Sequence, residues 1–369
     1  MKTLAIIGST GSIGKSTLNV YKKNKNKFQL LCLATHSNLK KLKYQKKIFK
    51  PKNIFLLNNN INHKKLITKE LFIKKYKKKK IDYVISGLSG FEAINFNFEL
   101  LKISKNLLIA NKETIICGGE IFINFAKKNN CKLLPIDSEH HCIDFFINNF
   151  KGKNLIKKYY ITASGGPFYD KKNIYNQSIK NVLKHPTWKM GKKISIDSSN
   201  FANKVLELFE AKILFKLSNK EIDIRVEKSS NVHAIIELTN NLVFPIMHTA
   251  KMEIPISNAL NLKNNFKLNF DDKMFSLLSP NKKKFPLINL GFKILSKYDH
   301  IGMIIFTVIN EKLVKMFLKN EIKYGDIVKI LINTFKNKKI FKFKSNIKDL
   351  NDINKAINYA KNIELCLKK

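Results

Sequence analysis

Arginine is almost absent from this chain of 369 residues. Of its 69 basic residues only Arg225 is an arginine, and all the others are lysines. Arginine recognises phosphates and bases with a planar, bidentate fork that the lysine ammonium cannot reproduce. The composition therefore argues against specific nucleic-acid recognition, for which we would expect arginine to be retained.

Acidic residues are scarce as well, and the formal net charge reaches +42. Such a charge is typical of polyanion-binding proteins. Lysine, asparagine, isoleucine and phenylalanine are enriched together, however, as in KKNKNKF at residues 22–28, and an A+T-rich genome would produce this set without selection for binding. We favour the compositional origin and keep polyanion or nucleic-acid binding as the alternative function.

Cysteine pairs and long hydrophobic runs are also missing. The five cysteines contain no C-x-x-C pair, which indicates reduced, mostly structural thiols rather than a metal site. No apolar run approaches the roughly 20 residues of a membrane helix. The first apolar run begins at Leu4, so we expect no targeting peptide, a cytoplasmic location and no membrane contact.

The first part of the chain contains a regular alternation of short apolar runs and helical patterns. The apolar runs lie at residues 4–7, 28–34, 53–57, 82–88, 106–110 and 131–137. Strands that alternate with helices form parallel sheets. The pattern therefore predicts an α/β fold whose N-terminal domain, residues 1–136, is Rossmann-like and doubly wound.

Three more segments follow. Residues 137–262 mix strand and helix patterns and predict a central α/β catalytic domain, with a lid loop at about residues 184–195. Residues 263–284 are polar and interrupted by proline, and they predict a linker. Residues 285–369 have apolar positions at helical spacing and predict a small C-terminal helical domain.

A glycine-rich turn, GSTGSIGKST, follows the first apolar run at residues 8–17. A P-loop would need glycine at position 9, where this chain has Ser9. The spacing Gly8-x-x-Gly11-x-x-Gly14 also departs from the dinucleotide fingerprint, yet a strand end, glycines and a helix N-terminus can still hold a pyrophosphate. We favour a dinucleotide and keep a P-loop kinase as an alternative.

The residues after the second apolar run favour NADP over NAD. An NAD enzyme places an acidic residue there to bind the ribose 2′-hydroxyl. This chain has no acid at that point; it has Thr35, His36, Ser37 and Asn38, followed by a lysine at position 40. Hydroxyl, amide and basic groups suit a 2′-phosphate.

Carboxylates in the sequence DSEH at residues 137–140 suggest a metal site. On extended backbone Asp137 and Glu139 would face the same way. A hard divalent cation would offset their repulsion. An exposed loop end is the alternative interpretation.

A helix expected from about Ser199 to Leu217 would place Asn203, Lys204 and Glu207 on one side. Lys204 could hold a phosphate and Glu207 could supply a third oxygen ligand. The alternative is a solvated Lys–Glu pair on an ordinary amphipathic helix.

Six motifs of this chain resemble those of the 1-deoxy-D-xylulose 5-phosphate reductoisomerase family. In order along the chain they are GSTGSIG, ANKE, DSEH, SGGPF, HPTWKMGKKISIDSS and NKVLE. The resemblance implies conversion of 1-deoxy-D-xylulose 5-phosphate to 2-C-methyl-D-erythritol 4-phosphate, in isoprenoid precursor synthesis. Metal-assisted rearrangement of the carbon skeleton would precede hydride transfer from NADPH. It further implies Mg²⁺ or Mn²⁺ as the metal and a homodimer.

The resemblance also assigns roles to residues. The residues implied to bind NADPH are Thr10, Gly11, Ser12, Ile13, Ser37, Asn38, Asn111, Glu113 and Gly191. The implied metal ligands are Asp137, Glu139 and Glu207. The implied substrate contacts are Lys112, Ser138, Glu139, Ser164, His185, Trp188, Ser198, Asn203, Lys204 and Glu207. The residues implied in catalysis are Lys112, Asp137, Glu139, Glu207 and His185.

Two positions depart from the family pattern. Where family members carry a His-Pro-x-Ser turn, this chain has Glu227-Lys228-Ser229-Ser230, and Glu253 replaces an arginine. Only the later His233 of that pattern is kept. Loss of the earlier histidine is expected to reduce turnover, but the metal, phosphate and lid motifs are intact, so we still expect activity.

Overall fold

The computed structural model describes residues 1–58, 66–188, 190–268, 276–343 and 346–365. The chain divides into two compact units. Unit 1 comprises residues 1–114, 122–141 and 251–266, and unit 2 comprises residues 115–121, 142–250 and 267–369. The domain boundaries predicted at residues 136, 262 and 284 stay a prediction.

A six-stranded sheet with strand order β3-β2-β1-β4-β5-β6 forms the framework of unit 1. Its strands are β1 (Lys2–Ile7), β2 (Phe28–Thr35), β3 (Asn53–Leu56), β4 (Ile81–Ser86), β5 (Ser104–Ile109) and β6 (Lys132–Pro135). All the strand pairs are parallel. The predicted Rossmann-like, doubly wound sheet is therefore confirmed, and each predicted apolar run overlaps one of its strands.

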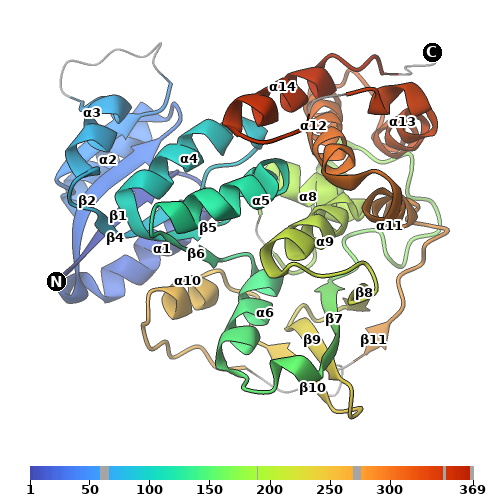
Figure 1. The fold of residues 1–369 in the computed structure, drawn as a ribbon, viewed down its shortest axis with the longest axis horizontal. Helices are drawn as coiled ribbons and strands as arrows, with labels where there is room; N and C mark the ends of the chain where they lie inside the picture. Colours follow the sequence, from blue (N-terminus) through green and yellow to red (C-terminus); the bar gives the residue numbers. More distant parts are fainter. Residues whose placement is uncertain (59–65, 189, 269–275, 344–345, 366–369) are drawn as a thin grey trace. The chain divides into compact units, whose positions relative to one another are not determined.

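The helices of unit 1 cover this sheet (Figure 1). They include α1 (Ser12–Lys23), α2 (Leu39–Phe49), α3 (Lys69–Tyr76), α4 (Ile94–Ile103) and α10 (Glu253–Ala259), while α5 (Lys112–Lys128) contributes both its ends. Ile256 and Leu260, from α10 and its C-cap, lie in the same buried core as Leu4 and Leu18. A late segment of the chain thus completes the core of the first unit.

The framework of unit 2 is a mixed sheet with strand order β10-β9-β7-β8-β11. Its strands are β7 (Ile156–Ala163), β8 (Ile222–Glu227), β9 (Val232–Leu238), β10 (Val243–Met247) and β11 (Leu277–Leu278). Only β7 and β8 pair in parallel. The short strand β11 lies in the segment predicted as a linker, of which residues 269–275 lie outside the described residues.

Helices make up the rest of unit 2. They include α6 (Ser138–Asn149, from Cys142 onwards), α7 (Ile179–Val182), α8 (Lys192–Ser199), α9 (Ala202–Phe215), α11 (Leu287–Lys297), α12 (Asp299–Leu318), α13 (Tyr324–Lys336) and α14 (Leu350–Lys361). The last four confirm the predicted C-terminal helical region. Helix α9 begins at Ala202 rather than near Ser199, because Phe201 adopts a left-handed backbone with φ 67 that separates it from α8.

Among the described residues, none of the helices combines the length and the hydrophobicity that crossing a membrane requires.

The glycine-rich turn between β1 and α1 depends on close backbone packing. Gly8 has a φ of +82, and a Cβ on Gly14 would lie 2.3 Å from the Gly8 carbonyl oxygen. The side chain of Ser9 has a structural role at position 9. Its hydroxyl donates to Gln45 Oε1 at 2.7 Å, and its carbonyl accepts from Gln45 Nε2 at 2.8 Å. The serine that a P-loop would exclude is thus a buried link to α2.

Gly14→Ala is expected to destabilise the protein by about 1–3 kcal/mol, because the added methyl group overlaps the Gly8 carbonyl. The higher helix propensity of alanine opposes this effect by roughly 1 kcal/mol. Urea unfolding measures the difference. Ser16→Ala, two positions along α1, is the matched control and should not destabilise; equal stability of the two variants would contradict the packing argument.

Candidate active site

The turn residues Thr10, Gly11, Ser12 and Ile13 lie where α1 begins. Gly11 is the N-cap of α1, and its carbonyl accepts from the N–H of Lys15 at 3.0 Å. The first N–H groups of a helix have no partner inside the helix and carry partial positive charge. This end of α1 therefore suits an anion such as a pyrophosphate.

Basic side chains gather next to that turn. Asn38, at the N-terminus of α2, accepts from the N–H of Lys41 at 3.1 Å, while Ser37 is exposed. Contact with Lys15 lowers the pKa of Lys41, because two adjacent ammonium groups repel each other. Sequence reasoning did not assign either lysine to the site. The available signal was a lysine in the first turn of each helix.

Asn111, Lys112 and Glu113 lie where β5 passes into α5. Asn111 caps α5 by accepting from the N–H of Thr114 at 2.7 Å, and its amide donates to Glu113 at 3.2 Å. Lys112 Nζ lies 3.0 Å from Asp137 Oδ2, and its side chain is only 6% exposed. The carboxylate and the ammonium therefore form an ion pair that has little contact with solvent.

The prediction of extended backbone at DSEH is wrong, because helix α6 begins at Ser138. The Asp137 carbonyl accepts from the N–H of His141 at 2.8 Å, which is a helical bond. Glu139 therefore lies in the first turn and accepts from the Ser138 hydroxyl at 2.6 Å. His140 Nδ1 lies 3.2 Å from Asp137 Oδ1. Carboxylates are favoured at a helix N-terminus, which explains why they gather here.

In unit 2, the turn after β7 meets the predicted lid loop. Ser164 Oγ lies 2.9 Å from His185 Nε2, and it accepts from the N–H of Gly166 at 3.2 Å. His185 Nδ1 accepts from the N–H of Trp188 at 2.9 Å. The neutral ring therefore carries its proton on Nε2 and donates it to Ser164. Burial lowers the pKa of His185 to about 4, which keeps the ring neutral at pH 7.

Glu207 is paired inside α9. It contacts the Lys204 ammonium and accepts from the Asn203 amide. The side chains of Lys204 and Glu207 are only 5% and 3% exposed. The alternative of a solvated surface pair is therefore wrong, and burial of such charges is typical of functional sites.

Helix α8 occupies residues 192–195 of the predicted lid loop, so the end of that loop was predicted wrongly. Its N-cap is Gly191, and Ser198 lies in its last turn. A Cβ on Gly166 would lie 2.8 Å from the Ser198 carbonyl oxygen, so the turn after β7 packs directly on α8. Position 189 of the lid loop lies outside the described residues.

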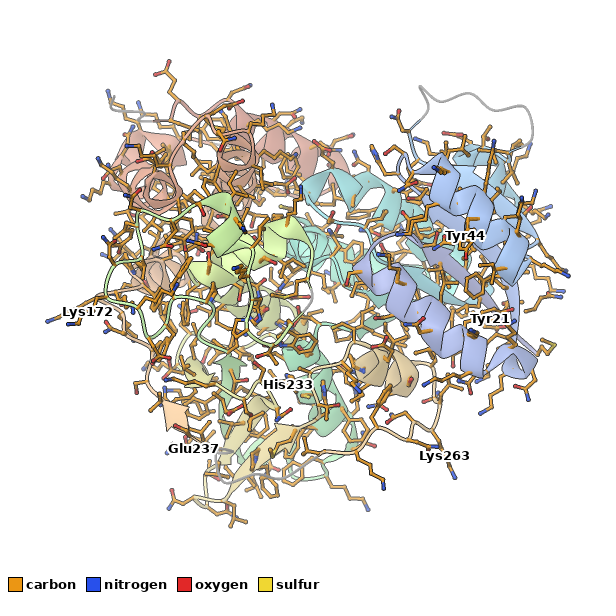
Figure 2. All side chains as sticks on the ribbon, turned by 180° about the vertical axis from the view of Figure 1, so that it is seen from behind. Tyr21, Tyr44, Lys172, His233, Glu237 and Lys263 are labelled. Carbon is orange, nitrogen blue, oxygen red and sulfur yellow. The ribbon has the colours of Figure 1, made fainter. Side chains whose placement is uncertain are left out.

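Trp188 packs against a pair of histidines that sequence reasoning did not assign to the site. Its ring centroid lies 6.1 Å from that of His233, which stacks on His248 at 3.8 Å. His233 belongs to β9, as does Glu237 (Figure 2). The only signal in the sequence was that His233 matches a histidine of the family pattern.

Glu227, which departs from the family pattern, is buried and holds a turn. Its carboxylate accepts from the N–H of Ser229 at 2.9 Å, the hydroxyl of Ser229 at 2.8 Å and the N–H of Asn231 at 3.2 Å. Ser230, at φ 60, donates to Thr187 of the lid loop at 3.4 Å. Glu253, the other departure, begins α10 and accepts from Asn19.

Each unit brings some of the predicted site residues together. In unit 1 the structure brings Lys112, Asp137, Ser138 and Glu139 together at the ends of β5 and β6. In unit 2 it brings Ser164 to His185, and Asn203 and Lys204 to Glu207.

Comparison with known proteins identifies the family. A model for 1-deoxy-D-xylulose 5-phosphate reductoisomerase matches residues 4–119, and two models for the C-terminal domain of that enzyme match residues 133–215 and 247–363. The reductoisomerase of Pelagibacter ubique is 39% identical, over 96% of this chain and 97% of the relative. This chain belongs to the 1-deoxy-D-xylulose 5-phosphate reductoisomerase family. The resemblance found in the sequence is confirmed.

Other relatives agree. The reductoisomerase of Clostridium novyi is 35% identical over 96% of both chains. A crystal structure of DOX-P reductoisomerase in complex with NADPH, fosmidomycin and magnesium superposes with a TM-score of 0.87 and 28% identity, covering 98% of this chain and 97% of the other. The reductoisomerase of Zymomonas mobilis in complex with NADPH, at 24% identity and a TM-score of 0.84 over 98% of this chain and 96% of the other, shows the same fold.

The lowered pKa of His185 predicts an acid-dependent loss of stability. The unfolded chain binds a proton at this group below pH 6.5, whereas the folded chain does so only below about pH 4. Stability should therefore fall as the pH falls through this window. Between pH 6.5 and 4, the midpoint temperature of thermal unfolding should fall less steeply for His185→Gln than for the wild type. Parallel curves would contradict the assigned burial.

Proposed function

We propose that this chain converts 1-deoxy-D-xylulose 5-phosphate to 2-C-methyl-D-erythritol 4-phosphate, with NADPH as reductant and a divalent cation as cofactor. The observation that carries this proposal is family membership over nearly the whole chain. A similar solved structure holds NADPH, fosmidomycin and magnesium. The comparisons give no support to polyanion binding as the function, nor to a kinase, and the buried Ser9 speaks against a P-loop.

The metal ligands in this proposal are Asp137, Glu139 and Glu207. Their carboxylate oxygens are the donors that Mg²⁺ and Mn²⁺ prefer. The donor set fits a divalent cation, because Asp137 and Glu207 each already form an ion pair with a lysine, Lys112 and Lys204 respectively. A bound cation could neutralise the same carboxylate charges. A bound cation would polarise vicinal oxygens of the ketose and stabilise developing negative charge.

The substrate contacts in this proposal are those that the family resemblance implies. Ser164, Ser198, Asn203 and Lys204 would hold the phosphate and hydroxyls of the substrate, and Ser138 and Glu139 would also contact it. Lys204 is suited to this role because its ammonium is buried, where an interaction with an anion is screened least. His185 and Trp188, in the lid loop, would exclude water from the reacting carbon skeleton.

The NADPH contacts in this proposal start at the turn before α1. Thr10, Gly11, Ser12 and Ile13 would line the pyrophosphate and ribose, and Ser37 and Asn38 would lie near the 2′-phosphate. We add Lys15 and Lys41, whose adjacent ammonium groups would be relieved by a dianion. Asn111, Lys112, Glu113 and Gly191 would face the nicotinamide end, where NADPH supplies the hydride.

Purified protein should oxidise NADPH only when both the deoxyxylulose phosphate and a divalent cation are present, and EDTA should abolish the reaction. Glu207→Gln should lower kcat/KM by about 100-fold or more, because one negatively charged ligand is lost. Turnover is measured as the loss of the absorbance band that NADPH has and NADP⁺ lacks. Absence of substrate-dependent oxidation by the wild type would refute the proposed activity.

We further propose that the protein is a homodimer in the cytoplasm. The four cysteines in the described residues are free and buried, which suits a reducing compartment. Strand β10 is an edge strand. Its residues Val243 and Phe244 are 54% and 37% exposed, and Leu242, just before the strand, is 55% exposed. An open edge with apolar side chains is a surface that a second copy could cover.

Val243→Lys should shift the protein from dimer to monomer, because the lysine would have to be buried at the interface. Sedimentation velocity measures the change. Leu71→Lys is a matched control, since Leu71 on α3 is 55% exposed and lies in unit 1. Dissociation by the control alone, or a monomeric wild type, would overturn this placement of the interface.

A further inference from the structure

Helix α8 is held by residues that are far away in the sequence. It is eight residues long, and its last turn carries Ser198, which the proposed function assigns to the substrate. The groups that hold this turn come from α12 and α13, in the C-terminal helical region. All of them belong to unit 2.

The first contact is made at Asp197, next to Ser198. Asn310 Nδ2, on α12, donates to Asp197 Oδ1 at 2.8 Å. The other carboxylate oxygen, Oδ2, accepts from Lys193 Nζ at 2.7 Å. Asp197 and Asn310 are 1% and 0% exposed. A buried carboxylate with both oxygens paired resists rotation, because each lost bond would leave an unpaired buried charge.

The second contact is made at Ser199, on the other side of Ser198. Ser199 Oγ lies 2.7 Å from the hydroxyl of Tyr324 on α13, and it donates its own proton to the Ile196 carbonyl at 2.6 Å. The tyrosine hydroxyl is therefore the donor to Ser199. The tyrosine ring is fixed in turn by edge-on packing against Phe168, with the centroids 5.6 Å apart.

We propose that Asn310 and Tyr324 are positioning residues that set the affinity for the substrate phosphate. They fix the two neighbours of Ser198, while Gly166 packs against the Ser198 carbonyl. The backbone at Ser198 is thereby held on three sides, and its hydroxyl is presented in one orientation before the substrate arrives. Preorganisation of this kind lowers the cost of binding. The inference rests on the proposed function, through the role of Ser198.

Tyr324→Phe removes only the hydroxyl and keeps the ring. It should raise the KM for the deoxyxylulose phosphate by about 5- to 10-fold, as expected for loss of one buried hydrogen bond. Asn310→Leu should raise it by about 10-fold or more, because it also leaves one Asp197 oxygen unpaired. Neither variant should change kcat, or the Kd for NADPH, by more than about twofold, because no contact to the reacting atoms is lost.

Thr307→Val is the matched control. Thr307 is a buried hydroxyl on α12 that donates to Met303 of the same helix, so its loss does not reach α8. The only tryptophan of the chain, Trp188, provides a second readout. Its fluorescence, titrated with inorganic phosphate, should show weaker binding in Tyr324→Phe than in the wild type or Thr307→Val.

The outcomes separate the two proposals. A wild type that does not turn over refutes the proposed function, and the inference is then judged by the phosphate titration alone. If the wild type is active, an unchanged KM in Tyr324→Phe overturns the inference. An equal rise of KM in Thr307→Val, or a parallel loss of NADPH affinity, also overturns it, because either would indicate general loosening of the fold.

Discussion

A buried carboxylate needs hydrogen-bond donors or a positive partner, and for Asp137 and Glu207 each unit of this protein supplies a lysine. Lys112 lies against Asp137 in unit 1, and Lys204 lies against Glu207 in unit 2. Without these lysines, burial of the acids would cost several kcal/mol each. The pairing also fixes the acids before any ligand binds, since an ammonium that holds a carboxylate restricts its rotamers. The fold of each unit determines where these pairs lie. Lys112 and Asp137 follow the strands β5 and β6, and Lys204 and Glu207 lie on helix α9.

The sequence was sufficient to predict the fold class, because the strands of unit 1 are buried on both faces and appear as continuous apolar runs. It was sufficient for the side of α9 that carries Asn203, Lys204 and Glu207, because helical spacing determines that face. It failed at DSEH, where a spacing of two residues does not distinguish an extended strand end from the first turn of a helix.

Other features depended on contacts between distant parts of the chain. The approach of Lys41 to Lys15 is set by the packing of two helices around the sheet, and no local pattern encodes it. The return of α10 to the core of unit 1 was not foreseen either, since its apolar positions suit any core. Family resemblance supplied the roles of the site residues, and those roles remain proposals.

The return of α10 constrains how the protein is made. Ile256, Leu260 and Leu262 belong to the core that Leu4 and Ile6 begin. A ribosome synthesises more than half of the chain before it reaches these residues. Until then, part of the apolar surface of the six-stranded sheet of unit 1 stays uncovered. Much of unit 2 is synthesised before the core of unit 1 is complete, so the two units cannot fold independently one after the other during synthesis. A nascent chain of this protein therefore needs protection from aggregation for longer than its N-terminal Rossmann-like sheet alone would require.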